Sequence, residues 1–385
     1  MATRVRPTVE MPALSAEILP AGVSARFVAN GNGLRMHLLE AGAGAARPLL
    51  LLLHGFPELA YSWRKLMPSL AAEGYHVVAP DQRGYGRTTG WDGGAAADPE
   101  AYAMPNLVRD VDGLITALGH GRVAAVIGHD FGAPVAAWCA LMLPERFPAL
   151  AMMSAPFAGP PPIPGAPRFA EIDAGLAALS RPRKHYQGYY STPAAAREMD
   201  APEGGLAAFL RAYYHVKSGD WRANAPHRLA SWAPSELAKM PTYYIMDRAA
   251  SMPETVAGAH PSADESAACR WLPPAELAIY AEEFARTGFA GGLRWYHAAT
   301  SGAGAATMRR FAGRAIAVPT IFIAGAADWG IYQAPGSFER MQESACADFR
   351  GAHLLARAGH WVQQEQPQAV TTILQDFLRS LDPRR

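Results

Sequence analysis

One aspartate lies where the chain leaves little room for a charged side chain. Residues 128–132 read Gly-His-Asp-Phe-Gly, and they follow an apolar run and precede an alanine-rich stretch. A nucleophile flanked in this way by two glycines is typical of a sharp turn from a strand into a helix, which exposes the middle side chain above a sheet. The pattern makes Asp130 a candidate nucleophile; the simpler interpretation is an ordinary turn or helix cap.

Two backbone N–H groups are candidates for an oxyanion hole beside Asp130. One belongs to Phe56, in the motif His-Gly-Phe-Pro at residues 54–57, which follows the leucine run at residues 49–53. The other belongs to Phe131, which opens the helix expected after the turn. A loop after the third strand and the residue after the nucleophile are the two places that supply such donors in this kind of site. Seen alone, the first motif is equally consistent with a simple turn.

A histidine and a second aspartate complete the arrangement of a catalytic triad. Asp328 ends a strand-like segment, and His360 follows it in the motif Gly-His-Trp at residues 359–361. The chain order Asp130, Asp328, His360 is nucleophile, acid, histidine. The strand-like segment at residues 149–157 ends without a carboxylate, so Asp328 is the better candidate for the orienting acid.

An aspartate at this position favours different chemistry from the more usual serine. A carboxylate is ionised at neutral pH, with a reference pKa of about 3.9, so it needs no base before it attacks. Attack on an ester would form a mixed anhydride, whereas displacement at a saturated carbon forms a stable ester. The leaving group is then either a halide or the oxygen of a strained ring that is protonated as it departs.

The rest of the chain predicts the elements that would position these residues. A hairpin is expected around residues 30–33, and apolar runs at residues 49–53, 76–81, 122–130, 149–156 and 319–328 read as strands covered on both faces. Helical spacing separates most of them, as at residues 106–119 and 134–143, and an amphipathic helix at residues 367–381 ends the chain. This alternation predicts an α/β protein with a mostly parallel, doubly wound sheet.

The alternation stops between residues 157 and 308. A Pro/Gly-rich hinge at residues 159–165 opens this segment, which is helix-like, rich in Trp and Tyr, and interrupted by proline rather than by strands. We therefore expect a helical cap inserted into the core. The predicted organisation is a first core part at residues 1–156, the cap at residues 157–308 and a second core part at residues 309–385.

Composition limits the partners of the protein. The 385 residues carry a formal net charge of +1 and are 50% hydrophobic, and the positive residues form no run of five, so neither nucleic acid nor an anionic membrane surface is expected as a partner. A small, largely uncharged ligand fits better. Homo-oligomerisation is compatible with the sequence.

The cysteines and the N-terminal segment bear on location. The three cysteines, Cys139, Cys269 and Cys346, lack metal-ligand spacing and are most simply buried thiols in a reducing compartment. No segment has the apolar length of a signal peptide core or of a membrane span. A cytoplasmic protein without a metal is expected.

Five stretches of the sequence together resemble the α/β-hydrolase superfamily, and more narrowly the epoxide hydrolases. They are HGFPELAYSWR, DQRGYGRTTG, GHDFGA, the Asp-Trp-Gly at residues 328–330, and AGHWVQQEQP. The resemblance runs from about residue 25 to the last helix. It implies an α/β-hydrolase fold with a helical cap, a small epoxide as substrate, an ester intermediate on Asp130 resolved by water that His360 activates, and no cofactor.

The same resemblance implies roles for residues of the cap. Family members have two cap tyrosines that point at the nucleophile; HYQGYY matches the first as Tyr186, with Tyr189 and Tyr190 as competitors, and LRWYHAA matches the second as Tyr296. Phenols of pKa about 10 can protonate the departing epoxide oxygen. Neighbours of the motif residues are expected to contact the substrate, namely His54, Pro57, Trp295 and Trp361.

Other activities within the superfamily remain alternatives. Haloalkane dehalogenases hold the halide with indole N–H groups, one directly after the nucleophile, where this chain has Phe131 without a donor. Phe131 also departs from the tryptophan common in epoxide hydrolases, which implies a change in pocket shape. The missing donor argues against a haloalkane dehalogenase, and the full set of Asp130, Asp328 and His360 argues against a ligand receptor with little turnover. Both are kept as alternatives, together with another hydrolase of small apolar substrates such as esters or lactones.

Overall fold

A computed structural model describes residues 11–44, 46–94, 96–162 and 168–381. The first ten residues of the N-terminal segment and residues 163–165 of the expected hinge lie outside the described residues. In the described part of the chain, no helix combines the length and the hydrophobicity that a bilayer crossing requires.

An eight-stranded sheet forms the centre of the protein, in the order β1-β2-β4-β3-β5-β6-β9-β10. The strands are β1 Val23–Ala29, β2 Arg35–Ala41, β3 Leu49–Leu53, β4 His76–Pro80, β5 Ala125–His129, β6 Leu150–Met153, β9 Thr320–Gly325 and β10 Phe349–Leu355. The expected hairpin is confirmed as the antiparallel pair β1 and β2, and β2 is also antiparallel to β4. The other neighbours are parallel. The mostly parallel α/β sheet predicted from the apolar runs is thus confirmed.

The strands that the sequence predicted are those whose residues are buried on both faces of the sheet. All five leucines of β3 are buried, as are β5 and β6, because these central strands are covered on both faces. Strand β10 was not predicted. It lies at the edge of the sheet beside β9, and its residues are partly exposed, so it lacks a continuous apolar run.

Helices flank the sheet, and α2 packs beside α3 while α1 packs beside α16. Outside the segment between β6 and β9, the helices are α1 Met67–Ala72, α2 Met104–Ala117, α3 Gly132–Met142, α14 Ser337–Arg340, α15 Val362–Glu365 and α16 Pro367–Ser380. Turns of 3-10 helix are η1 Ala16–Ile18, η2 Ala60–Trp63, η3 Pro99–Tyr102 and η4 Trp329–Ile331, and η5 Met341–Ala345 is a π-helical turn. The last helix matches the amphipathic segment predicted at the end of the chain.

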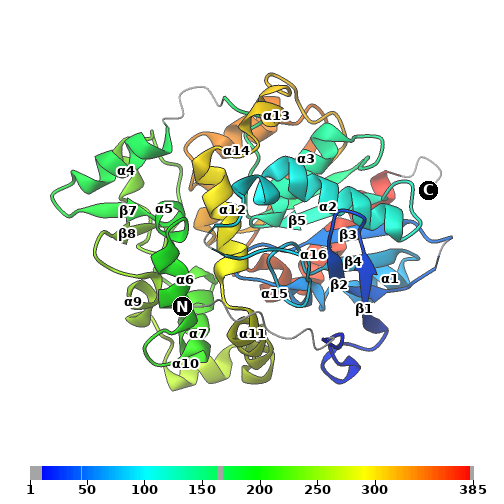
Figure 1. Cartoon of the computed structure of the whole chain (residues 1–385), viewed down its shortest axis with the longest axis horizontal. Helices are drawn as coiled ribbons and strands as arrows, with labels where there is room; N and C mark the ends of the chain where they lie inside the picture. Colours follow the sequence, from blue (N-terminus) through cyan, green and yellow to red (C-terminus); the bar gives the residue numbers. More distant parts are fainter. Residues whose placement is uncertain (1–10, 45, 95, 163–167, 382–385) are drawn as a thin grey trace.

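The segment between β6 and β9 is mainly helical and lies to one side of the sheet (Figure 1). Its helices are α4 Phe169–Ala177, α5 Tyr186–Tyr190, α6 Pro193–Asp200, α7 Leu206–Lys217, α8 Pro234–Leu237, α9 Met252–Ala257, α10 Ala263–Ala268, α11 Pro274–Thr287, α12 Ala290–Ser301 and α13 Ala305–Arg309. The expectation that no strand interrupts this segment is wrong, because β7 Arg183–His185 and β8 Ile245–Asp247 form a separate antiparallel pair. Strands of three residues are too short to show an alternating pattern. The boundaries at residues 157 and 308 stay a prediction.

Candidate active site

Asp130 occupies the turn between β5 and α3, with a positive φ of 48°. The flanking glycines are required because other backbones pass close to them. A Cβ on Gly128 would lie 2.7 Å from the Cα of Ala133, and one on Gly132 would lie 2.6 Å from the carbonyl oxygen of His54. The local sequence therefore forces a strained conformation on Asp130, and such strain concentrates at functional sites.

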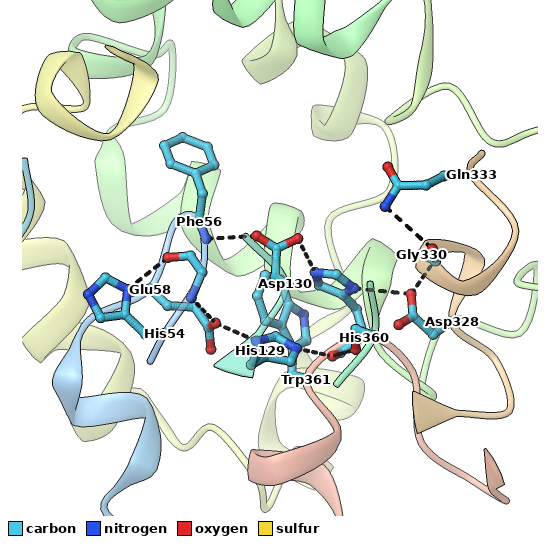
Figure 2. A network of polar contacts seen from close by, with 12 residues as sticks. His54, Phe56, Glu58, His129, Asp130, Asp328, Gly330, Gln333, His360 and Trp361 are labelled. Atoms are coloured by element: carbon cyan, nitrogen blue, oxygen red, sulfur yellow. Dashed lines mark hydrogen bonds and ion pairs between the residues drawn. The ribbon is translucent and has the colours of Figure 1, made fainter. Parts of the chain in front are cut away.

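The structure brings Asp130, Asp328 and His360 together (Figure 2). His360 Nδ1 lies 3.0 Å from Asp328 Oδ1, and its Nε2 lies 3.1 Å from Asp130 Oδ2. All three side chains are buried. The His360 imidazole thus bridges the two carboxylates, and its Nε2 faces a carboxylate oxygen of Asp130, the candidate nucleophile.

Charge pairing controls the protonation of this triad. Burial disfavours a charged imidazole, but the Asp328 carboxylate and the contact with Asp130 outweigh burial and raise the pKa of His360 to about 9. Burial disfavours a charged Asp130 as well, yet His360 holds the pKa of this carboxyl well below its usual range. The pKa of Asp328 is lowered for the same reason. The free site therefore holds two carboxylates and one imidazolium at neutral pH.

Of the two candidate oxyanion donors, Phe56 already contacts Asp130. Its backbone N–H donates a 2.9 Å hydrogen bond to Asp130 Oδ1. Phe131 is the N-cap residue of α3, and its N–H has no acceptor among the described residues. A Cβ on Gly55 would lie 2.8 Å from the Asp130 Cγ, so only glycine lets the Phe56 loop approach this closely. The role of Phe131 stays a prediction.

Tyr296, on α12, packs against the rings of both candidate oxyanion-hole residues. Its ring centroid is 5.4 Å from that of Phe56 and 5.1 Å from that of Phe131. Burial, and then the negative charge of Asp130, raise the pKa of Tyr296 well above its ordinary value. The phenol therefore keeps its proton, and its hydroxyl has no hydrogen-bond partner among the described residues.

Tyr186, at the start of α5, has a more constrained hydroxyl. It donates a 2.9 Å hydrogen bond to Gln333 Oε1 and accepts a 3.2 Å bond from Gln187 Nε2. Its ring centroid lies 5.9 Å from that of Tyr296. The two competing tyrosines direct their hydroxyls elsewhere, Tyr189 to Glu198 and Tyr190 to Tyr213.

The four residues expected to contact a substrate form hydrogen bonds with other groups of the protein. His54 Nδ1 donates to the carbonyl of Gly55, and its Nε2 accepts from the N–H of Gln82. The indole N–H groups of Trp295 and Trp361 donate to the carbonyls of Arg83 and Tyr214, and the carbonyl of Pro57 accepts from the Tyr214 hydroxyl. Their polar atoms thus position loops, and contact with a substrate stays a prediction.

Comparison with known proteins supports one assignment throughout. A family profile described as the alpha/beta hydrolase fold matches residues 48–178. Epoxide hydrolase B of Mycobacterium tuberculosis is 34% identical, covering 92% of this chain and 98% of its own. Epoxide hydrolase A of the same organism is 36% identical, covering 94% of this chain and 100% of its own.

Solved structures agree with these relatives. Epoxide hydrolase A from Mycobacterium thermoresistibile is 36% identical and superposes with a TM-score of 0.73 over 93% of this chain and 98% of its own. An epoxide hydrolase from an endophytic Streptomyces is 30% identical, with a TM-score of 0.76 over 94% of this chain and 97% of its own. The chain belongs to the epoxide hydrolase family.

Two residues of this epoxide hydrolase that the sequence analysis missed form a buried ion pair beneath the nucleophile. His129 Nδ1 lies 2.5 Å from Glu58 Oε2, and His129 Nε2 lies 2.7 Å from the carbonyl oxygen of His360. Both ring nitrogens of His129 face acceptors, and the contact with His129 holds the pKa of Glu58 below its usual value despite burial. The pair anchors the backbone of His360 (Figure 2). Both residues stand in quoted motifs, His129 in GHDFGA and Glu58 in HGFPELAYSWR, but no spacing signals that the two side chains meet.

The epoxide hydrolase also anchors its histidine loop to the C-terminal end of α7 and to the residues that follow it. The His360 N–H donates a 2.8 Å bond to the carbonyl of Lys217. Glu365 accepts from the N–H groups of Gly219 and Gly359 at 2.7 and 3.0 Å, and thus joins the two segments. A Cβ on Gly359 would lie 2.6 Å from the nitrogen of Gly219, which shows how closely the two backbones meet.

Metal ligands are not clustered in the part of the chain that the structure describes. No group of three or more His, Cys, Asp or Glu side chains there is arranged to hold a metal ion. Cys139, Cys269 and Cys346 are free thiols.

Proposed function

We propose that this epoxide hydrolase converts a small epoxide to a vicinal diol through an ester on Asp130. The observation that carries the proposal is the placement of the Asp130 carboxylate, with one oxygen on the N–H of Phe56 and the other on His360 Nε2. The first contact supports an oxyanion hole for the ester carbonyl, and the second supports His360 as a base beside the position of a hydrolytic water.

Ring opening is the first step. The Asp130 carboxylate attacks one epoxide carbon, the C–O bond of that carbon breaks, and the departing oxygen takes a proton from Tyr296 or Tyr186. Burial keeps both phenols protonated, since it raises the pKa of each well above 10. The free hydroxyl of Tyr296 makes it the stronger candidate for the donor, because the hydroxyl of Tyr186 is already engaged by Gln333.

Formation of the ester lowers the pKa of His360, so that His360 can act as a base. The ester has no charge, so the His360 imidazolium loses one of the two carboxylates that raise its pKa, and it gives up its proton to the phenolate left by ring opening. Neutral His360, oriented by Asp328, then takes a proton from water as the water oxygen attacks the Asp130 carbonyl. The N–H groups of Phe56 and Phe131 would hold the oxyanion. As the intermediate collapses, the bond between the Asp130 carbonyl carbon and the ester oxygen breaks, and the departing alkoxide takes the second proton of the added water. The diol leaves, and carboxylate and imidazolium are restored.

Trapping the ester tests this proposal. His360→Gln retains the nucleophile but lacks the base, so an epoxide is expected to add its full mass to the peptide that contains Asp130, and Asp130→Ala should show neither adduct nor turnover. In a single turnover in heavy-oxygen water, wild-type protein should take up the label in the Asp130 carboxyl. Steady turnover by His360→Gln would refute the assignment of the base, and halide release from a bromoalkane without any epoxide turnover would favour the dehalogenase alternative.

The same proposal covers the organisation and location of the chain. We infer that residues 157–308 act as a cap over the core formed by residues 1–156 and 309–385, which is supported by the helices and the short sheet between β6 and β9. The free state of the three cysteines supports a reducing, cytoplasmic location.

A further inference from the structure

Lys217, the last residue of α7, has a buried side chain, 3% exposed, among aromatic rings. Its Nζ lies 4.6, 5.1, 5.7 and 5.9 Å from the ring centroids of Tyr244, Tyr213, Tyr243 and Tyr186, respectively. We call these four rings the tyrosine cage. Among the described residues, no carboxylate pairs with Lys217 and no group accepts a hydrogen bond from its Nζ. Ring faces attract a cation, most strongly where water is excluded, so the cage holds the ammonium in place of water.

A cage of neutral rings leaves the charge of the ammonium uncancelled. A carboxylate partner would offset that charge, whereas a ring attracts a cation through its quadrupole and adds no net charge. The charge acts on the candidate active site. Burial favours a neutral Asp130 carboxyl, His360 outweighs burial, and the Lys217 ammonium lowers the pKa of Asp130 further. A buried cation that lacks a carboxylate partner but acts on the nucleophile indicates a role in the charge changes of the reaction.

Only one of the two candidate acids has a cation over its ring among the described residues. Tyr186 is a wall of the tyrosine cage, whereas no lysine or arginine there lies over Tyr296. The N–H of Tyr186 donates a 2.9 Å bond to the carbonyl of Tyr244, and the two rings pack edge to face at 5.1 Å. Burial, and then the charge of Asp130, raise the pKa of both candidate acids. Of the two phenolates, that of Tyr186 would therefore have a counter-charge.

We propose that Lys217 acts through Tyr186 as a positioning residue, and that its ammonium stabilises the phenolate which forms when Tyr186 protonates the epoxide oxygen. The inference rests on the proposed function. As Asp130 forms its bond to the epoxide carbon, the ring C–O bond breaks, and its electron pair stays on the oxygen, which takes the Tyr186 proton. One negative charge thus moves from Asp130 to the ring of Tyr186, where the ammonium faces it. Tyr296 can donate in parallel, without this counter-charge.

The Tyr296→Phe background isolates Tyr186 as the acid. In this background, Lys217→Met removes the charge and should slow ester formation with styrene oxide at least about tenfold, because an opposite charge at this range shifts a pKa by about 1–3 units. In the Tyr186→Phe background, the same change should slow ester formation by less than about threefold, since the two sites are then independent. Rapid-quench mass spectrometry of the peptide that contains Asp130 measures the ester.

A variant that retains the charge separates electrostatics from structure. Lys217→Arg keeps a cation that also binds ring faces, so in the Tyr296→Phe background it should form the ester within about threefold of the rate with lysine. The carbonyl of residue 217 that accepts the His360 N–H belongs to the backbone and is retained in each variant. Circular dichroism checks folding, and Lys217→Gln takes the place of Lys217→Met if the methionine variant does not fold.

A second lysine over a tyrosine ring supplies a matched control. Lys184 Nζ lies 4.7 Å from the ring centroid of Tyr189, and the hydroxyl of Tyr189 is bonded to Glu198. Lys184→Met removes the same kind of contact from a tyrosine that we do not place in the reaction. It should leave the rate of ester formation unchanged in both backgrounds.

The outcomes distinguish the two proposals. If wild-type protein forms neither ester nor diol with styrene oxide or 1,2-epoxypropane, the proposed function fails. If the ester forms but Lys217→Met slows it equally in the two backgrounds or in neither, the proposed function stands and the role of Lys217 is wrong. A folded Lys217→Arg variant as slow as Lys217→Met would also overturn that role, because the charge would then not be what matters.

Discussion

Replacing Asp130 with Asn should change the protonation of His360. The substitution keeps the shape of the side chain but removes the negative charge that lies 3.1 Å from His360 Nε2. An opposite charge at such a distance shifts a pKa by about 1–3 units. The pKa of His360, about 9 in the wild type, should therefore fall to about 6–8, which corresponds to about 1.4–4 kcal/mol of lost imidazolium stabilisation.

The pKa can be read by NMR titration of the imidazole nitrogens, with the His360 signals identified by their absence from His360→Gln. Asp376→Asn is a suitable control, because it removes a carboxylate from the exposed side of α16 and should leave the His360 titration unchanged. A pKa that stays near 9 in Asp130→Asn would show that Asp130 is not the partner that raises it.

The same shift has a kinetic counterpart. The ester on Asp130 is uncharged, like the asparagine, so the rate at which the ester decays should rise with pH through the lowered pKa of His360, about 6–8. Single-turnover decay of the ester, followed from pH 5 to pH 10, measures this dependence. A decay rate that rises only near pH 9 would contradict the proposed change of the base.

The other predictions concern ring opening. Tyr296→Phe should slow ester formation by about 10²–10⁴-fold, Tyr186→Phe should slow it less because its hydroxyl is bonded to Gln333, and the double variant should nearly abolish it; normal ester formation in the double variant would rule out the phenols as the acid. Gly55→Ala places a methyl group against the Asp130 carboxyl and should prevent ester formation, whereas Gly121→Ala, which meets nothing within 4 Å, should not. Rapid-quench measurement of the ester checks both predictions, with circular dichroism as the control for folding, and a Gly55→Ala variant that reacts at the wild-type rate would contradict the close approach described here.

Local patterns were sufficient to predict the centre of the fold. Buried parallel strands such as β3 and β5 carry continuous apolar runs, and the glycines around Asp130 mark a turn that other residues cannot form. Edge strand β10 and the short pair β7 and β8 were missed. Their residues are partly exposed or too few, so neither hydrophobicity nor alternation distinguishes them from loops.

The site was predictable to the extent that its residues occur in motifs. Asp130, Asp328 and His360 follow from chain order, and the structure places them in contact. Glu58 and Gln333 were missed, because their partners lie 71 and 147 residues away in the chain and no spacing signals such a contact. The tyrosines needed the resemblance to a family, since one phenol among 14 is not distinguished by its neighbours.

The anchoring of His360 to Lys217 and, through Glu365, to Gly219 restricts how substrates enter. If α7 and the residues after it moved away from the sheet as a rigid body, His360 would lose the hydrogen bond from its N–H to Lys217 that fixes its backbone. Substrate entry through a wide movement of this segment would thus displace the base in every catalytic cycle.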